Sequence, residues 1–172
     1  MMKLRRKINK TPLILIFFLI MLLTHWYRIK DKYIINPSKS LTRGIYKLYP
    51  PVDIKQGDIV VFKIPKELKD YCKHRGYILN RTETLMKKVA AFSSDKIEIK
   101  NQEIFINNIS WGKIYRVDSK YRDLPQLKTE KVIPNKNEFL PLVKTDGSFD
   151  GRYFGAIKKQ EIQAKAELFL QF

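Results

Sequence analysis

The longest uninterrupted apolar stretch of the chain runs from Leu13 to Leu23. It is shorter than the roughly 20 residues that usually span a bilayer, so a cleavable signal peptide and a retained anchor are both open interpretations. Trp26 and Tyr27 follow it, where a cleavage site would have small residues, and such aromatics are typical of a membrane interface. The pattern therefore predicts a basic N-terminal segment with a retained transmembrane helix, residues 1–32. The charges before the apolar run are Lys3, Arg5, Arg6, Lys7 and Lys10.

These N-terminal charges also predict an orientation. By the positive-inside tendency they outweigh Arg28, Lys30 and Lys32 on the other side of the apolar run. We expect a single-pass protein of the inner (cytoplasmic) membrane with a cytoplasmic N-terminus. Residues 33–172 would then form an exported domain on the periplasmic or extracytoplasmic side.

The pattern after the apolar run is mostly that of strands. A β-branched apolar run opening from a Gly-Asp turn predicts a buried strand over 57–64, and four isoleucines alternating with polar residues predict a hairpin over 97–106. Prolines interrupt 117–142, which predicts a loop with short edge strands. Only 160–170 has a helix-like composition. The predicted fold class is mainly β, behind one N-terminal transmembrane helix.

Charge and size narrow the class of protein. The 172 residues suit one small domain with an appendage, and the net charge is +17, of which seven units belong to residues 1–32. The remaining basic charge suits anionic membrane lipid. Its lysines are scattered through strands and loops and are not interleaved with aromatics along one element, so we expect no specific nucleic-acid partner.

The candidate chemistry can be narrowed by elimination. Cys72 is the single cysteine, which excludes an internal disulfide framework and a multi-cysteine zinc site, and we expect neither a metal nor a cofactor. We expect Cys72 to be an ordinary half-buried side chain. The imidazoles are His25, at the edge of the apolar segment, and His74, in a cationic neighbourhood typical of a surface residue. A serine activated by histidine is therefore disfavoured.

Lysine is the other activator of serine, but at a pKa of about 10.4 only about one lysine in 2,500 is neutral at pH 7. Lowering that pKa to about 8 requires roughly 3 kcal/mol of destabilisation of the ammonium, which apolar burial can supply. Lys87 has apolar sequence neighbours on both sides, and in a strand Lys87 and Lys88 would point to opposite faces. On these residues alone, a solvated lysine pair remains the commoner outcome.

Three segments of the sequence, in this order along the chain, resemble the conserved blocks of the type I signal peptidase superfamily. They are Ser38-Lys39-Ser40-Leu41, then Leu85-Met86-Lys87-Lys88-Val89 followed by Asp95, then Ser148-Phe149-Asp150-Gly151-Arg152-Tyr153-Phe154-Gly155. The similarity runs from about residue 12 to the C-terminus. The small size, Arg43-Gly44-Ile45-Tyr46 and Arg75-Gly76-Tyr77 look most like the conjugative-transfer, TraF-like branch. The chain departs from the family pattern at Gly151, where a serine is usual, and we expect added backbone freedom there.

The resemblance implies a role for each matching residue. Ser40 matches the nucleophile, Lys87 its general base, and Ser38 the hydroxyl that joins the Ser40 backbone N–H in an oxyanion hole. Ser148 matches a serine that orients the lysine amine. Asp150 and Arg152 match a structural ion pair that supports the site; without the resemblance, this segment is an ordinary surface turn.

The resemblance therefore implies a membrane-anchored serine endopeptidase that processes an exported precursor, a pilin in conjugative transfer, by hydrolysis or by cyclisation of the product. Its partners would be the precursor and membrane lipid. A general secretory signal peptidase I is an alternative with the same chemistry. A non-catalytic anchored subunit of a secretion or conjugation apparatus, or a basic DNA-contact protein, would not require Ser40 and Lys87 to converge.

Overall fold

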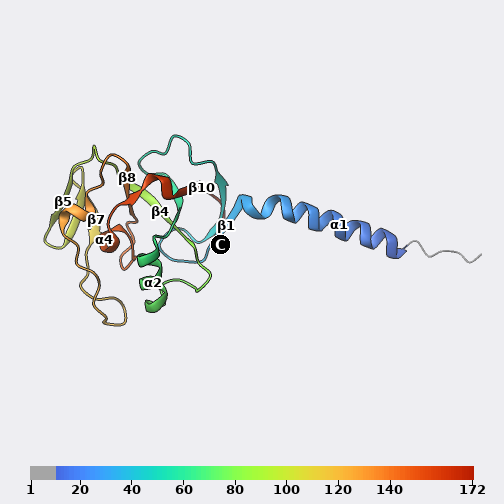
Figure 1. Cartoon of the computed structure of the whole chain (residues 1–172), viewed down its shortest axis with the longest axis horizontal. Coiled ribbons are helices and arrows are strands. Elements are labelled where there is room, and N and C mark those ends of the chain that lie inside the picture. The colour runs from blue at the N-terminus through green and yellow to red at the C-terminus, as the bar shows by residue number, and fades with distance from the viewer. Residues whose placement is uncertain (1–10) are drawn as a thin grey trace, which may run out of the picture.

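The structure is a computed structural model that describes residues 11–172. Helix α1 (Thr11–Ile29) projects from the body of the molecule, and the 3-10 turn η1 (Lys30–Lys32) joins it to the first strand (Figure 1). The basic residues at positions 3–10, on which the predicted orientation depends, lie outside the described residues.

The predicted membrane-spanning segment in residues 1–32 is not supported. Among residues 11–172, no helix has both the length and the apolar character needed to cross a membrane. The uninterrupted apolar run is 11 residues long, and Thr24 and His25 follow it within α1. At 1.5 Å per residue such a run covers about 16 Å of a hydrocarbon core that is roughly 30 Å thick.

The prediction of a mainly β fold is confirmed. A seven-stranded antiparallel sheet has the order β1-β2-β10-β3-β4-β8-β9. Its strands are β1 (Tyr33–Asn36), β2 (Gly44–Tyr49), β3 (Ile59–Lys63), β4 (Thr84–Ala91), β8 (Glu138–Leu142), β9 (Ile157–Lys158) and β10 (Ile162–Gln171). The predicted buried strand over 57–64 corresponds to β3, in which Val60, Val61 and Phe62 are buried.

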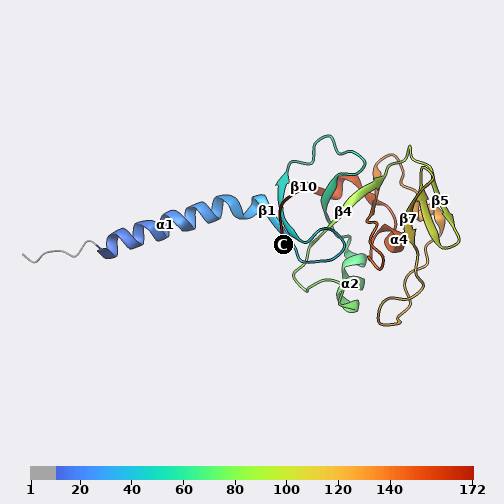
Figure 2. The same cartoon turned by 180° about the vertical axis from the view of Figure 1, so that it is seen from behind.

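A second sheet contains the predicted hairpin. Its strands are β5 (Ile97–Lys100), β6 (Glu103–Ile106) and β7 (Ile109–Lys113), and it lies at the end of the body remote from α1 (Figures 1 and 2). Ile97 pairs with Ile106 and Ile99 with Ile104. Asn101 and Gln102 between the arms have positive φ angles, which asparagine tolerates better than most residues.

In the described part of the chain, buried apolar side chains form three clusters that join these elements. One cluster connects the small sheet to β4 and β8, a second lies between β3, β4, β8 and β9, and a third lies between β2, β3 and β10. The clusters contain Ala90, Ala91, Ile97, Ile104, Ile106, Val132, Leu140 and Leu142; Val60, Phe62, Val89, Phe139 and Ile157; and Tyr46, Val61, Ala164 and Ala166. Strand β4 contributes to the first two, so its position is fixed on both sides.

The helix suggested for 160–170 is wrong. These residues form the 3-10 turn η2 (Lys159–Glu161) and β10, which pairs with β2 and β3. Ala, Lys, Glu and Gln favour a helix by composition, but Ile162, Ala164 and Ala166 alternate with polar residues, and this period of two matches the half-buried strand.

Helix α2 (Lys66–Arg75) was not predicted from the sequence. It follows Pro65 and ends at Gly76, whose φ of 71° provides the left-handed C-cap. Both residues are ordinary helix-boundary signals. The short helices α3 (Thr129–Val132) and α4 (Gly151–Phe154) complete the fold.

The segment 117–142 is a loop for most of its length, as predicted, but its last strand is not at an edge. Strand β8 pairs with both β4 and β9. Pro141 is accommodated because the β4–β8 register shifts between Val89 and Ala91, and a bulge is where a proline can sit inside a sheet.

Candidate active site

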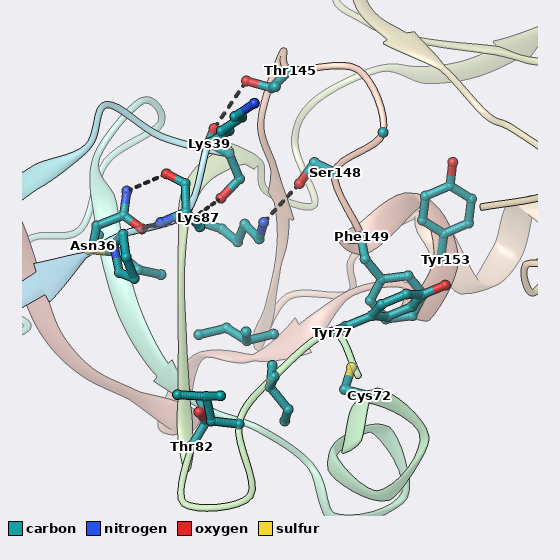
Figure 3. A pocket seen from close by; sticks show the side chains of 18 of the residues that line it. Asn36, Lys39, Cys72, Tyr77, Thr82, Lys87, Thr145, Ser148, Phe149 and Tyr153 are labelled. Atoms are coloured by element: carbon teal, nitrogen blue, oxygen red, sulfur yellow. Dashed lines mark hydrogen bonds between the residues drawn. The ribbon is translucent and has the colours of Figure 1, made fainter. Parts of the chain in front are cut away.

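Residues from all three sequence blocks line one pocket of about 1280 Å³. Ser38 and Ser40 come from the turn between β1 and β2, Lys87 from β4, and Ser148 from the loop between β8 and α4. Figure 3 shows the side chain of Lys87 extending toward Ser148 across this pocket. The structure therefore gathers four of the predicted site residues, which are as many as 110 positions apart in the chain (Ser38 to Ser148).

Lys87 is buried in β4 with 5% of its surface exposed, whereas Lys88 is exposed on the opposite face, as the strand pattern predicts. Burial lowers the pKa of Lys87 to about 8 from its ordinary value of 10.5, and the nearby Asp150 carboxylate opposes part of this shift. The amine donates a hydrogen bond of 2.8 Å to the Ser148 hydroxyl. A large share of this amine is consequently neutral near pH 8.

The two serines of the turn are in direct contact. The Oγ atoms of Ser38 and Ser40 are 2.9 Å apart, and the Ser38 hydroxyl donates to Oδ1 of Asn36 at 2.8 Å. The hydroxyl of Thr145 donates to the Ser40 carbonyl at 3.1 Å, which ties the turn to the loop that carries Ser148. In this arrangement the Ser40 hydroxyl and the Lys87 amine share the pocket while each is hydrogen-bonded to a different serine.

Asp150 and Arg152 form a fully buried ion pair behind the pocket, with Nη2 of Arg152 2.8 Å from Oδ2 of Asp150. The Asp150 carboxylate also accepts hydrogen bonds from the backbone N–H groups of Val143 and Arg152, at 3.2 Å each. The Arg152 guanidinium donates to the carbonyls of Val143 and Lys113. The pair thus joins β7, the loop containing Ser148, and α4.

Gly151, where the family pattern usually has a serine, is closely packed in the structure. A Cβ at Gly151 would lie 2.8 Å from both the Leu140 side chain and the Pro141 carbonyl, so a larger residue would not fit without movement of β8. The glycine permits close packing of α4 on β8 beside the buried ion pair.

An aromatic stack that the sequence analysis did not single out forms one side of the pocket. The ring of Phe149 lies 5.4 Å from that of Tyr71 and 5.5 Å from that of Tyr153, both stacked, and 4.9 Å from that of Tyr77. Figure 3 shows Phe149 and Tyr77 beside one another, with Cys72 beneath them. Because these rings come from α2, from α4 and from two separate loops, no local pattern in the sequence indicates them.

Cys72 lies on α2 and lines the pocket, and it is buried where a half-buried side chain was expected. Burial raises the pKa of its thiol to about 11, so it is protonated near neutral pH and is a poor nucleophile. His74 is exposed, as predicted. Within residues 11–172, no three His, Cys, Asp or Glu side chains gather closely enough to hold a metal ion.

A polar clamp connects α2 to the loop 115–124 at the rim of the pocket. Tyr77 donates a hydrogen bond of 2.6 Å to Asp118, and Nε of Arg122 donates to the same carboxylate at 2.8 Å. Arg122 also donates to the Arg75 carbonyl, while Arg75 donates to the carbonyl of Asp123. We refer to Arg75, Tyr77, Asp118 and Arg122 as the rim clamp.

An antiparallel β fold that places serine hydroxyls and a buried, low-pKa lysine in one pocket has the functional groups of a serine hydrolase. The chain belongs to the family described as "Signal peptidase, peptidase S26", which matches residues 7–171. It is therefore a peptide-bond hydrolase of the signal peptidase type, and its substrate is a precursor protein.

Relatives within this family agree with the predicted branch. Two proteins named "Plasmid transfer protein TraF", both from Escherichia coli, are 29% and 27% identical to the chain over 138 residues. The alignments cover 74% and 75% of this chain and 77% of each relative. A crystal structure of a signal peptidase I from Enterococcus faecalis V583 has a TM-score of 0.37 and 18% identity, covering 64% of this chain and 94% of that one. The predicted similarity to the TraF-like branch is confirmed.

Proposed function

We propose that residues 33–172 form a serine endopeptidase that processes an exported pilin precursor in conjugative transfer on the extracytoplasmic side, with Ser40 as nucleophile and Lys87 as general base. The observation that carries the proposal is the state of Lys87. It is a buried lysine with a pKa of about 8, and it lies in the same pocket as a serine hydroxyl. The names of the TraF relatives support a role in plasmid transfer, and the pilin substrate rests on the resemblance to the conjugative-transfer branch.

The lowered pKa makes the acid–base chemistry feasible. With a pKa of about 8, about one Lys87 in ten is neutral at pH 7, compared with about one in 2,500 for an unperturbed lysine. A neutral amine can remove the Ser40 proton as Oγ attacks the scissile carbonyl. The resulting ammonium can then protonate the leaving amine.

The first motion required is a rotation of the Ser40 hydroxyl. Its hydroxyl now contacts Ser38, so it must turn toward the Lys87 amine when substrate enters. The Lys87 amine is already held by Ser148, and both groups are buried, which limits the conformations available to the base.

The oxyanion of the tetrahedral intermediate would accept hydrogen bonds from the Ser38 hydroxyl and the Ser40 backbone N–H. One such donor is typically worth about 3 to 4 kcal/mol of barrier. Water resolves the acyl-enzyme in hydrolysis, whereas the N-terminal amine of the substrate resolves it in cyclisation.

Co-expression with a candidate pilin precursor tests this proposal. The intact mass of the precursor is measured with the wild type, Ser40→Ala, Lys87→Ala and, as the matched control, Lys88→Ala. Processing should be lost in the first two variants and retained in the control. A cyclised product would weigh about 18 Da less than the hydrolysed one, because no water is added when an amine resolves the acyl-enzyme. Wild-type processing by Ser40→Ala or Lys87→Ala would overturn the assignment.

A further inference from the structure

Asn36 is the last residue of β1, and its side-chain amide lies inside the turn that carries Ser38 and Ser40. It is 7% exposed, and it pairs with Gly44 across the β1–β2 ladder, so that it closes the turn of residues 37–43. Its Nδ2 donates to the carbonyls of Ser38, Leu41 and Thr42 at 3.3, 3.3 and 3.1 Å. Its Oδ1 accepts from the N–H and the hydroxyl of Ser38 at 3.2 and 2.8 Å.

These partners fix the orientation of the amide. Three carbonyl oxygens can accept only from an NH₂ group, and the Ser38 backbone N–H can donate only to an oxygen. A flipped amide would place its oxygen against three carbonyls. Oδ1 of Asn36 therefore faces Ser38, and the single hydroxyl proton of Ser38 has a defined acceptor.

The position of that proton determines what the neighbouring serine can do. When the Ser38 hydroxyl donates to Asn36, its oxygen presents lone pairs to the Ser40 hydroxyl 2.9 Å away. The Ser38 hydroxyl then donates to a neutral acceptor, Oδ1 of Asn36, and it can switch to a stronger acceptor when one enters the site. A negatively charged oxyanion is such an acceptor, because hydrogen bonds to ionised groups are about twice as strong as neutral ones.

We propose that Asn36 is a positioning residue for this reaction, which acts through Ser38. In the resting site Oδ1 accepts the hydrogen bond of the Ser38 hydroxyl. As the Ser40 proton passes to Lys87, the Ser38 hydroxyl turns and donates its hydrogen bond to the oxyanion, with its proton still bonded to Oγ. Oδ1 keeps the Ser38 N–H as a partner throughout, so no buried acceptor is left unpaired. The three carbonyl contacts of Nδ2 meanwhile hold the turn in one shape. This inference rests on the proposed roles of Ser40, Lys87 and Ser38.

A double-mutant cycle between Asn36 and Ser38 tests the proposal. kcat and KM are measured with the precursor of the co-expression assay for Asn36→Ala, Ser38→Ala and the double variant. Each single variant should lower kcat by about 100-fold or more with KM changed by less than about twofold, because the Ser38–oxyanion hydrogen bond forms only in the transition state: Ser38→Ala removes its donor, and Asn36→Ala removes the contacts that orient that donor. The double variant should be no slower than the slower single variant, because both changes remove the same interaction.

Tyr46→Phe is the matched control. The Tyr46 hydroxyl donates to the Thr42 carbonyl at 2.8 Å, so this variant removes a hydrogen bond from the same turn without touching either serine. Its kcat should stay within about twofold of wild type. Thermal melting of every variant shows that the assays are made on folded protein. Asn36→Ser carries the same expectation as Asn36→Ala and replaces it if Asn36→Ala does not fold.

The outcomes separate this inference from the proposed function. An inactive Ser40→Ala with an Asn36→Ala of wild-type kcat would overturn the role of Asn36 alone. Losses in Asn36→Ala and Ser38→Ala that multiply in the double variant would also overturn it, because Asn36 would then act independently of Ser38. A fully active Ser40→Ala would instead overturn the proposed function.

Discussion

The amine of Lys87 lies 2.8 Å from the hydroxyl of Ser148, although the two residues are 61 positions apart in the chain. Both are buried, and Ser148 belongs to the loop that the Asp150–Arg152 ion pair fixes against β7 and α4. The contact therefore links the proposed base to the most buried charges of the fold. A base held in this way needs little reorganisation before it accepts a proton.

The pH dependence of processing should reflect the lysine. If neutral Lys87 is the base, kcat/KM should rise about tenfold per pH unit below pH 8 and level off above it, since the pKa of Lys87 is about 8. A pH–rate profile with the precursor measures this. A profile that is flat from pH 6 to pH 9 would contradict the assignment.

Replacement of Lys87 by methionine should stabilise the protein while it abolishes activity. Its pKa is lowered to about 8 in the folded state from 10.5, so below pH 8 both states bind the proton and the penalty of burying the ammonium is fully present. The free energy of unfolding of Lys87→Met should exceed that of wild type by up to about 3 kcal/mol at pH 7. The difference should shrink between pH 8 and pH 10.5. Denaturant unfolding at pH 7 and pH 10 tests this, and an equal difference at both would contradict it.

The buried ion pair should matter far more than an exposed one. Asp150→Ala leaves the Arg152 guanidinium buried without its carboxylate, which should lower the free energy of unfolding by about 3 to 5 kcal/mol. Glu98→Ala, which breaks the surface contacts of Glu98 with Lys96 and Lys100, is the control and should cost far less, because such pairs are screened by solvent. Similar losses for the two variants, measured by urea denaturation, would show that Asp150 and Arg152 do not support the fold in this way.

The rim clamp should affect substrate binding and not the chemical step. Burial, together with the hydrogen bond to Asp118, raises the pKa of Tyr77 to about 12, so the phenol stays protonated and donates at physiological pH. Tyr77→Phe should raise KM severalfold and speed amide hydrogen exchange in residues 115–124, with kcat little changed. Tyr121→Phe, at a side chain that is 89% exposed in the same loop, should leave both unchanged. A fall in kcat without a change in KM would refute this role.

Much of the fold could be predicted because several strands have a clear local pattern of apolar and polar residues. The β3 run and the β5–β6 hairpin follow the period of two, and the lysine pair divides between the two faces of β4 as a strand requires. The helix predicted over 160–170 was wrong because its composition favours a helix, whereas its alternation of apolar and polar residues is that of strand β10. The missed α2 had boundary signals at Pro65 and Gly76 but little apolar periodicity, since most of its residues are polar.

The site residues that could be predicted are those in the three sequence blocks that resemble the signal peptidase superfamily. Ser38, Ser40, Lys87 and Ser148 lie around one pocket, and Asp150 and Arg152 lie behind it. Asn36 lies two residues before Ser38 and was not predicted as a site residue, because its role depends on hydrogen bonds made inside a closed turn. The aromatic stack and the rim clamp depend on tertiary contacts among α2, α4 and three loops, which no periodicity encodes.

Trapping the acyl-enzyme would test the central claim most directly. The wild type and the Ser40→Ala, Lys87→Met and Lys88→Met variants are incubated with a precursor peptide that has an ester in place of the scissile amide, quenched in acid, and analysed by intact mass and peptide mapping. An ester speeds acylation relative to breakdown of the acyl-enzyme, so the adduct accumulates. We predict one acyl group on Ser40 in the wild type and in Lys88→Met, and none in Ser40→Ala or Lys87→Met. An adduct on another residue, or acylation of Lys87→Met at the wild-type rate, would contradict the serine–lysine assignment.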